Sequence, residues 1–123
     1  MTTQDKAKNA VKWINELLNT DLPQGTGILG SKKQGFCCLG LGCHILNIFY
    51  GDSEGDSEEL KETVGLLDSE GKPWSDHSVE SLVTLNDELL YSFKAIADRL
   101  ITEPEEYFES EVAEQITNYF NQE

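Results

Sequence analysis

The sequence predicts an α+β fold, in which a small, mostly antiparallel sheet of two hairpins packs with four or five helices. Several segments place apolar residues at helical spacing, which predicts the helices. Two polar, turn-forming stretches are each flanked by short apolar segments, a pattern typical of hairpins. No repeat or linker-like stretch divides the 123 residues, so we expect a single domain covering residues 1–123.

The first half of the chain holds two predicted helices. Apolar residues recur at helical spacing over about residues 4–19, with lysines on the other faces. Residues 39–50 are dense in apolar side chains and predict a buried helix, despite two glycines. A short third helix is capped by Ser78 or Ser81 and is broken by the Asn86-Asp87 pair.

Two further helices are predicted towards the C-terminus. Ser92 is suited to cap the first of them, which runs to Ile101. The C-terminal helix covers about residues 104–122. Thr102 and Glu105 match a capping box before it, and acidic residues in its first turn complement the helix dipole.

The two predicted hairpins lie in the middle of the chain. Residues 27–29 and 35–37 flank a polar turn, and residues 63–67 and 72–74 flank a second one that contains glycine. Residues 51–59 read as a polar, acidic loop.

Charge is distributed unevenly and restricts the classes of partner. Residues 1–50 carry a formal charge of +2, whereas residues 51–123 carry −16. Binding of a nucleic-acid backbone relies on Lys and Arg, so we expect no direct nucleic-acid binding. The chain shows neither a long apolar run nor a signal peptide, so we expect a protein of the host-cell cytoplasm that does not bind membranes.

The segment from residue 24 to 44 is where chemistry is concentrated. It holds six of the ten glycines, all three cysteines and the adjacent pair Lys32-Lys33. Residues 25–30 match G-x-G-x-x-G. A dinucleotide fingerprint also needs a strand before this motif and a helix after it, and neither is predicted here. Backbone N–H groups of a glycine-rich turn beside the two lysines could still cradle a phosphate, and the alternative is a purely structural hairpin.

The cysteines invite a metal or catalytic interpretation, which we weigh against burial. Cys37, Cys38, Cys43 and His44 do not show the paired spacing of structural zinc ligands, so no metal site is predicted. A catalytic thiol would need an oriented imidazole, and no third orienting group is evident. We therefore expect buried free cysteines that act as small hydrophobic side chains.

Three motifs together resemble a family of small proteins encoded by bacteriophages and prophages. They are a QGTG turn, the segment GFCCLGLGCHI, and SLVTLNDELLYSFKAIADRLI, which covers the LND and SFxxIAD motifs. The resemblance runs from about Val11 to Ile101. This chain departs from the pattern at His44, where the family usually has Asp, and in its extension past Ile101. The resemblance implies a phage origin and no particular activity.

These observations lead to a functional hypothesis with two alternatives. We expect a phage accessory protein that antagonises host defence by binding and sequestering a nucleotide-like signalling molecule, without catalysis or cofactor. The first alternative is an acidic decoy that mimics nucleic acid and binds a host defence protein through carboxylates of residues 52–62 and 103–114. The second is a thiol-dependent enzyme. The sequence is also compatible with a homo-oligomer.

The predicted ligand-binding residues come from the glycine-rich segment, a loop tryptophan and the predicted Asn-Asp turn. Trp74 lies in a turn-rich stretch and either fills the core or stacks on a ligand. The predicted set is Gln24, Gly25, Thr26, Gly27, Lys32, Lys33, Trp74, Asn86 and Asp87.

Overall fold

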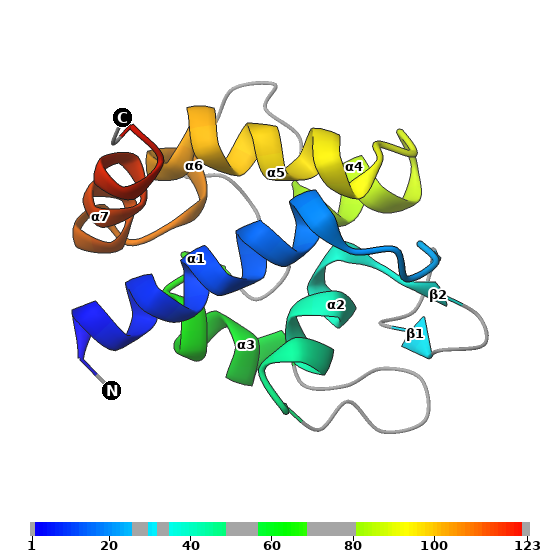
Figure 1. The fold of residues 1–123 in the computed structure, drawn as a ribbon, viewed down its shortest axis with the longest axis horizontal. Coiled ribbons are helices and arrows are strands. Elements are labelled where there is room, and N and C mark those ends of the chain that lie inside the picture. Colours follow the sequence, from blue (N-terminus) through cyan, green and yellow to red (C-terminus); the bar gives the residue numbers. More distant parts are fainter. Residues whose placement is uncertain (1, 26–29, 32–34, 49–56, 69–80, 122–123) are drawn as a thin grey trace.

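Helix α1 (Thr3–Asn19) crosses the middle of the molecule and packs against α2, α3, α5 and α7 (Figure 1). The computed structural model describes residues 2–25, 30–31, 35–48, 57–68 and 81–121. The other elements, in chain order, are β1 (Gly30–Ser31), β2 (Gly35–Phe36), α2 (Cys38–Ile45), α3 (Ser57–Val64), α4 (Leu82–Asp87), α5 (Phe93–Thr102), α6 (Pro104–Tyr107) and α7 (Ser110–Phe120).

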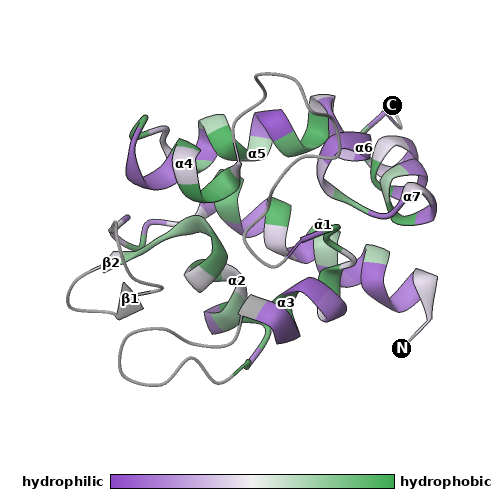
Figure 2. Ribbon diagram, turned by 180° about the vertical axis from the view of Figure 1, so that it is seen from behind, coloured by the Kyte–Doolittle hydropathy of each residue, from purple (hydrophilic) through white to green (hydrophobic). Residues whose placement is uncertain are grey.

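Helix α1 forms as its apolar pattern predicts. Thr2 and Asp5 exchange hydrogen bonds in a capping box, with the Asp5 N–H donating to Thr2 Oγ1 at 3.1 Å. One stripe of the helix is buried, and its largest member, Trp13, is fully enclosed. Figure 2 shows the same division along the other helices, whose hydrophobic and hydrophilic residues alternate around the axis.

The α+β prediction is wrong, because the described residues are predominantly helical. The first hairpin is reduced to two residues per strand, with Gly30 paired to Phe36 and Ser31 to Gly35. The second hairpin does not form over its first arm: Thr63 and Val64 end helix α3. Its other arm, residues 72–74, lies outside the described residues.

Two helices differ from the prediction in the middle of the chain. Helix α3 begins inside the stretch that was predicted as an acidic loop, because Leu60 and Val64 lie one turn apart and are both fully buried. Helix α4 begins after its cap Ser81 and includes Asn86 and Asp87, which were predicted to break it.

The predicted C-terminal helix is interrupted. Residues 104–107 form α6, and α7 begins only at Ser110. Between them the chain runs beside the residues after α3: Leu67 N–H donates to the Tyr107 carbonyl, and Glu109 N–H donates to the Gly65 carbonyl, both at 2.8 Å. These bonds, with the bridge between Leu66 and Phe108, satisfy backbone groups outside the helices and stabilise the break.

Gly65 is expected to tolerate no side chain. Its φ is +76°, and a Cβ would lie 2.8 Å from Val112 Cγ2. We expect Gly65→Ala to lower the free energy of unfolding by about 2–4 kcal/mol, from left-handed strain and overpacking together. Urea denaturation would measure the change. In a Val112→Ala background the same substitution should cost only the backbone strain, and an unchanged midpoint in the wild-type background would contradict the packing.

Candidate functional site

The side-chain amide of Asn86 lies fully buried on the last turn of α4 and makes four hydrogen bonds. Its Oδ1 accepts from Gln24 Nε2 at 2.8 Å and from the Cys38 backbone N–H at 3.2 Å. Its Nδ2 donates to the Gly25 carbonyl at 2.9 Å and to Asp87 Oδ1 at 2.7 Å. An asparagine amide has two donor hydrogens and two acceptor lone pairs, so every position is used. We call Gln24, Gly25, Cys38, Asn86 and Asp87 the Asn86 network.

Gln24 extends this network to the start of α5. Its Nε2 also donates to the Tyr91 carbonyl at 2.7 Å, and its Oε1 accepts from the Phe93 backbone N–H at 3.1 Å. Phe93 is the first residue of α5, and first-turn N–H groups have no acceptor within their own helix. A side chain from a distant loop thus completes the cap that Ser92 provides for the same helix.

Backbone hydrogen bonds close the base of the glycine-rich segment beside the network. The Gly25 N–H donates to the Phe36 carbonyl at 2.8 Å, and the Phe36 N–H donates to the Pro23 carbonyl at 2.9 Å. Gly35 has a φ of +90°, and a Cβ there would lie 2.8 Å from backbone atoms of Gln24 and Gly25. Glycine is therefore required for the two chain segments to approach so closely.

The structure brings together four of the nine predicted site residues. Gln24 and Gly25 meet Asn86 and Asp87 within the Asn86 network, at the end of the molecule where β2, α2 and α4 lie (Figure 1). Because the amides of Gln24 and Asn86 are engaged in internal bonds, they hold the surrounding backbone in place. The other predicted residues lie outside the described part of the chain: Thr26, Gly27, Lys32, Lys33 and Trp74.

The three cysteines are buried, as the sequence predicts. Cys37 is the N-cap of α2, where its Sγ accepts from the Gly40 N–H at 3.3 Å. Burial raises the pKa of the Cys37 thiol to about 11, and burial also raises the pKa of Cys38 well above its ordinary value. Cys43 is fully buried as well. Neutral thiols are poor nucleophiles, so these environments disfavour the thiol-enzyme hypothesis.

Trp13 connects the network to the hydrophobic core. Its indole Nε1 donates to the Cys38 carbonyl at 2.9 Å, while the Cys38 N–H donates to Asn86. On the other side Trp13 meets Phe108 edge to face, with ring centroids 6.3 Å apart. The same peptide segment of α2 is thus held by a side chain from α1 and a side chain from α4.

Several groups of the site could not be recognised in the sequence. The Cys38 N–H, the Tyr91 carbonyl and the Phe93 N–H are backbone groups, and no residue type marks them. Asn86 itself was visible, but its pairing with Asp87 suggested a turn. The only available signal was the position of Asn86 four residues after the buried Leu82, which places both on one helix face.

Comparisons do not place the chain in a family. It matches no protein-family model, and neither curated protein sequences nor solved structures give a match. Within the described ranges, no three His, Cys, Asp or Glu side chains are grouped as metal ligands would be. None of the helices in those ranges has the length and apolar character needed to cross a membrane.

Asn86→Asp should destabilise the fold strongly. The substitution replaces the Nδ2 donor with an acceptor oxygen that faces the Gly25 carbonyl and the Asp87 carboxylate. A buried donor–acceptor network broken in this way costs about 3–5 kcal/mol. Chemical denaturation at neutral pH would measure it, with the exposed Asn118→Asp on α7 as the control of equal charge. Equal midpoints for the two variants would show that the network contributes nothing to stability.

The buried Cys37 thiol makes stability depend on alkaline pH. Its folded pKa of about 11 exceeds the ordinary value of 9.0, so the unfolded chain loses this proton first. Stability from this group should be complete below about pH 9 and be lost as the pH rises to about 11, a decline of about 2 kcal/mol. Urea midpoints across this range should fall less steeply for Cys37→Ala than for the wild type. Parallel profiles would contradict the burial of this thiol.

Proposed function

We propose that this chain is a phage accessory protein that binds and sequesters a small nucleotide-like signal of host defence. The observation that supports the proposal is the meeting of two predicted site segments, Gln24-Gly25 and Asn86-Asp87, at the base of the glycine-rich segment. The phage origin rests on the resemblance of three sequence motifs. The thiol-dependent enzyme is the less favoured alternative, because burial raises the pKa values of Cys37 and Cys38.

The proposal divides the site into positioning and contacting residues. Gln24 and Asn86 use their amides within the protein, so we assign them to holding the two ends of residues 25–35 in place. Thr26, Gly27, Lys32 and Lys33 are the proposed contacts for phosphate, because backbone N–H groups and lysine ammonium groups are the usual partners of small anions. Trp74 is the proposed stacking partner of a base. The half-buried Asp87 is the proposed acceptor for a ribose hydroxyl.

The charge pattern favours this end of the chain for an anion. Residues 1–50 have a formal charge of +2, although the whole chain carries −14. A nucleotide approaching the acidic remainder of the surface would be repelled at a range of about 8 Å at physiological salt. Local binding at the two lysines is therefore compatible with an acidic protein.

Replacing both lysines should weaken nucleotide binding without unfolding the protein. We expect Lys32→Ala with Lys33→Ala to lower affinity about tenfold or more, since each charge-assisted hydrogen bond contributes roughly 1.5–3 kcal/mol. Calorimetric titration with cyclic mono- and dinucleotides and linear di- and triphosphates would measure it. The matched control is Lys8→Ala with Lys12→Ala, which removes the same charge from exposed positions on α1.

Two results of this titration would overturn the proposal. The first is no binding by the wild type at high micromolar nucleotide. The second is an equal loss of nucleotide affinity in both double variants. The acidic decoy would then be the hypothesis to pursue.

A further inference from the structure

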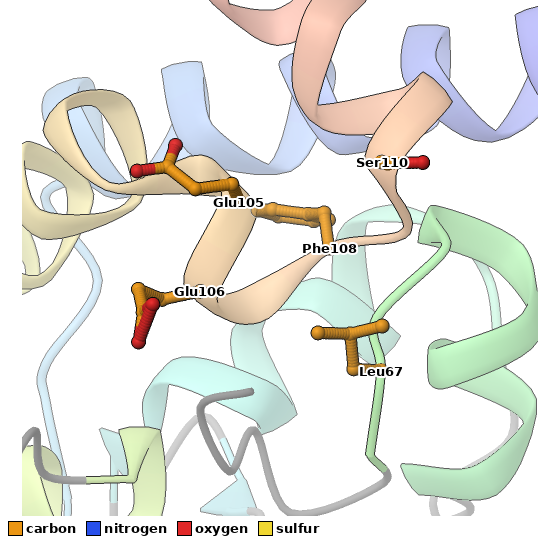
Figure 3. Close-up of a pocket in the computed structure, with 5 residues that line it drawn as sticks. All are labelled: Leu67, Glu105, Glu106, Phe108 and Ser110. Atoms are coloured by element: carbon orange, nitrogen blue, oxygen red, sulfur yellow. The ribbon is translucent and has the colours of Figure 1, made fainter. Parts of the chain in front are cut away.

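A cavity of about 410 Å³ lies where α6 passes into α7, away from the Asn86 network (Figure 3). It is lined by Leu67, Glu105, Glu106, Phe108 and Ser110. Pockets that bind small molecules have volumes of roughly 300–1,000 Å³. The cavity is therefore large enough for a small organic ligand.

Backbone hydrogen bonds join the two chain segments that line this cavity. Leu67 N–H donates to the Tyr107 carbonyl, the residue between Glu106 and Phe108, at 2.8 Å. The Leu66–Phe108 bridge continues the same pairing. Both lining segments are thus fixed relative to each other, and a ligand would meet a preformed site.

The lining combines apolar and acidic groups. Phe108 is almost fully buried, and Leu67 is half-buried beside it. Glu105 and Glu106 leave α6 in different directions, and their carboxylates lie apart from each other (Figure 3). Ser110, the first residue of α7, completes the lining, and its hydroxyl points away from the other four side chains (Figure 3).

Glu106 differs from the acidic residues three positions before and after it. Glu103 pairs with Arg99 at 3.0 Å, and Glu109 pairs with Lys6 at 3.3 Å. In the described part of the chain, Glu106 Oε1 is buried and has no hydrogen-bond partner. A buried carboxylate oxygen without a donor is costly, and such atoms in native proteins call for a water, an ion or a ligand.

The geometry points to a binding site for a small organic cation, a protonated amine or guanidinium with an apolar body. The charged group would pair with the carboxylate of Glu106, whose half-buried side chain lines the cavity, and the apolar body would lie against Leu67 and Phe108. Calcium fits less well, since it takes six to eight oxygen ligands and gains nothing from apolar walls. A nucleotide is disfavoured by the two carboxylates. The site uses none of the residues proposed for nucleotide binding and adjoins the opposite end of α5 (Figure 1).

Titration with phenethylammonium tests this inference, with 2-phenylethanol as a neutral probe of similar shape. Chemical shifts of the Leu67 and Phe108 amides would follow binding to the full chain. We expect saturable binding of the ammonium ion, and at least tenfold weaker binding of the alcohol, because a charge-assisted hydrogen bond is lost.

Two variants test whether binding depends on Glu106 itself or on the overall negative charge of the protein. Glu106→Gln keeps the shape of the side chain and should weaken ammonium binding at least tenfold. Glu114→Gln removes the same charge from an exposed position on α7 and should change ammonium affinity less than about twofold. Thermal midpoints confirm that each variant is folded.

Three results would overturn the inference. The first is no saturable shift up to about 10 mM ammonium, which would exclude even millimolar affinity. The second is equal binding of the alcohol. The third is equal effects of Glu106→Gln and Glu114→Gln in folded protein.

Discussion

The buried side chain of Asn86 imposes the constraint on which the arrangement of this end of the molecule depends. An amide removed from water must find partners for all of its donors and acceptors, or the fold loses roughly 1–3 kcal/mol for each group left unpaired. Asn86 finds its partners in Gln24, Gly25, Cys38 and Asp87. Helix α4, the start of α2 and the loop after α1 therefore have one relative position in which all of these bonds form.

Cys38 links the Asn86 network to the hydrophobic core. Its N–H is bound by Asn86 and its carbonyl by Trp13, so a polar network and an apolar core share one peptide segment. Close packing supports this arrangement, since a Cβ on Gly42 of α2 would lie 3.0 Å from the Trp13 indole. Displacement of α1 or α4 would therefore disturb both kinds of interaction at once.

Amphipathic helices could be predicted from the sequence, whereas the prediction of a two-hairpin sheet was wrong: the first hairpin forms two residue pairs, and the first arm of the second ends helix α3. The apolar stripes of α1 and α5, and the cap of α5 at Ser92, are local patterns that tertiary structure leaves unchanged. The apolar residues Val64 and Leu66 predict a strand, because a short apolar run fits either a strand or a helix. Gly65, with a φ of +76°, follows the last residue of α3 and ends this helix. Leu66 then bridges to Phe108, a distant partner that no local pattern indicates.

For the candidate site, some of the residues could be predicted from the sequence, but their roles could not. Residue types indicated Gln24, Gly25, Asn86 and Asp87, and the structure brings these four together. Their roles were not visible, because the partners are largely backbone groups, which look alike at every position of a sequence. The cavity beside Glu106 could not be predicted either, because it lies at the break between α6 and α7, and the sequence predicts one continuous helix there.

Hydrogen exchange of two backbone amides tests the Asn86 network most directly. The N–H groups of Cys38 and Phe93 are first-turn amides whose acceptors are the side chains of Asn86 and Gln24. We predict that both exchange as slowly as interior amides of α1, and more slowly than Ala95, whose acceptor is the exposed Ser92 hydroxyl. Exchange of Cys38 and Phe93 within about tenfold of the rate of an unstructured peptide would contradict the network.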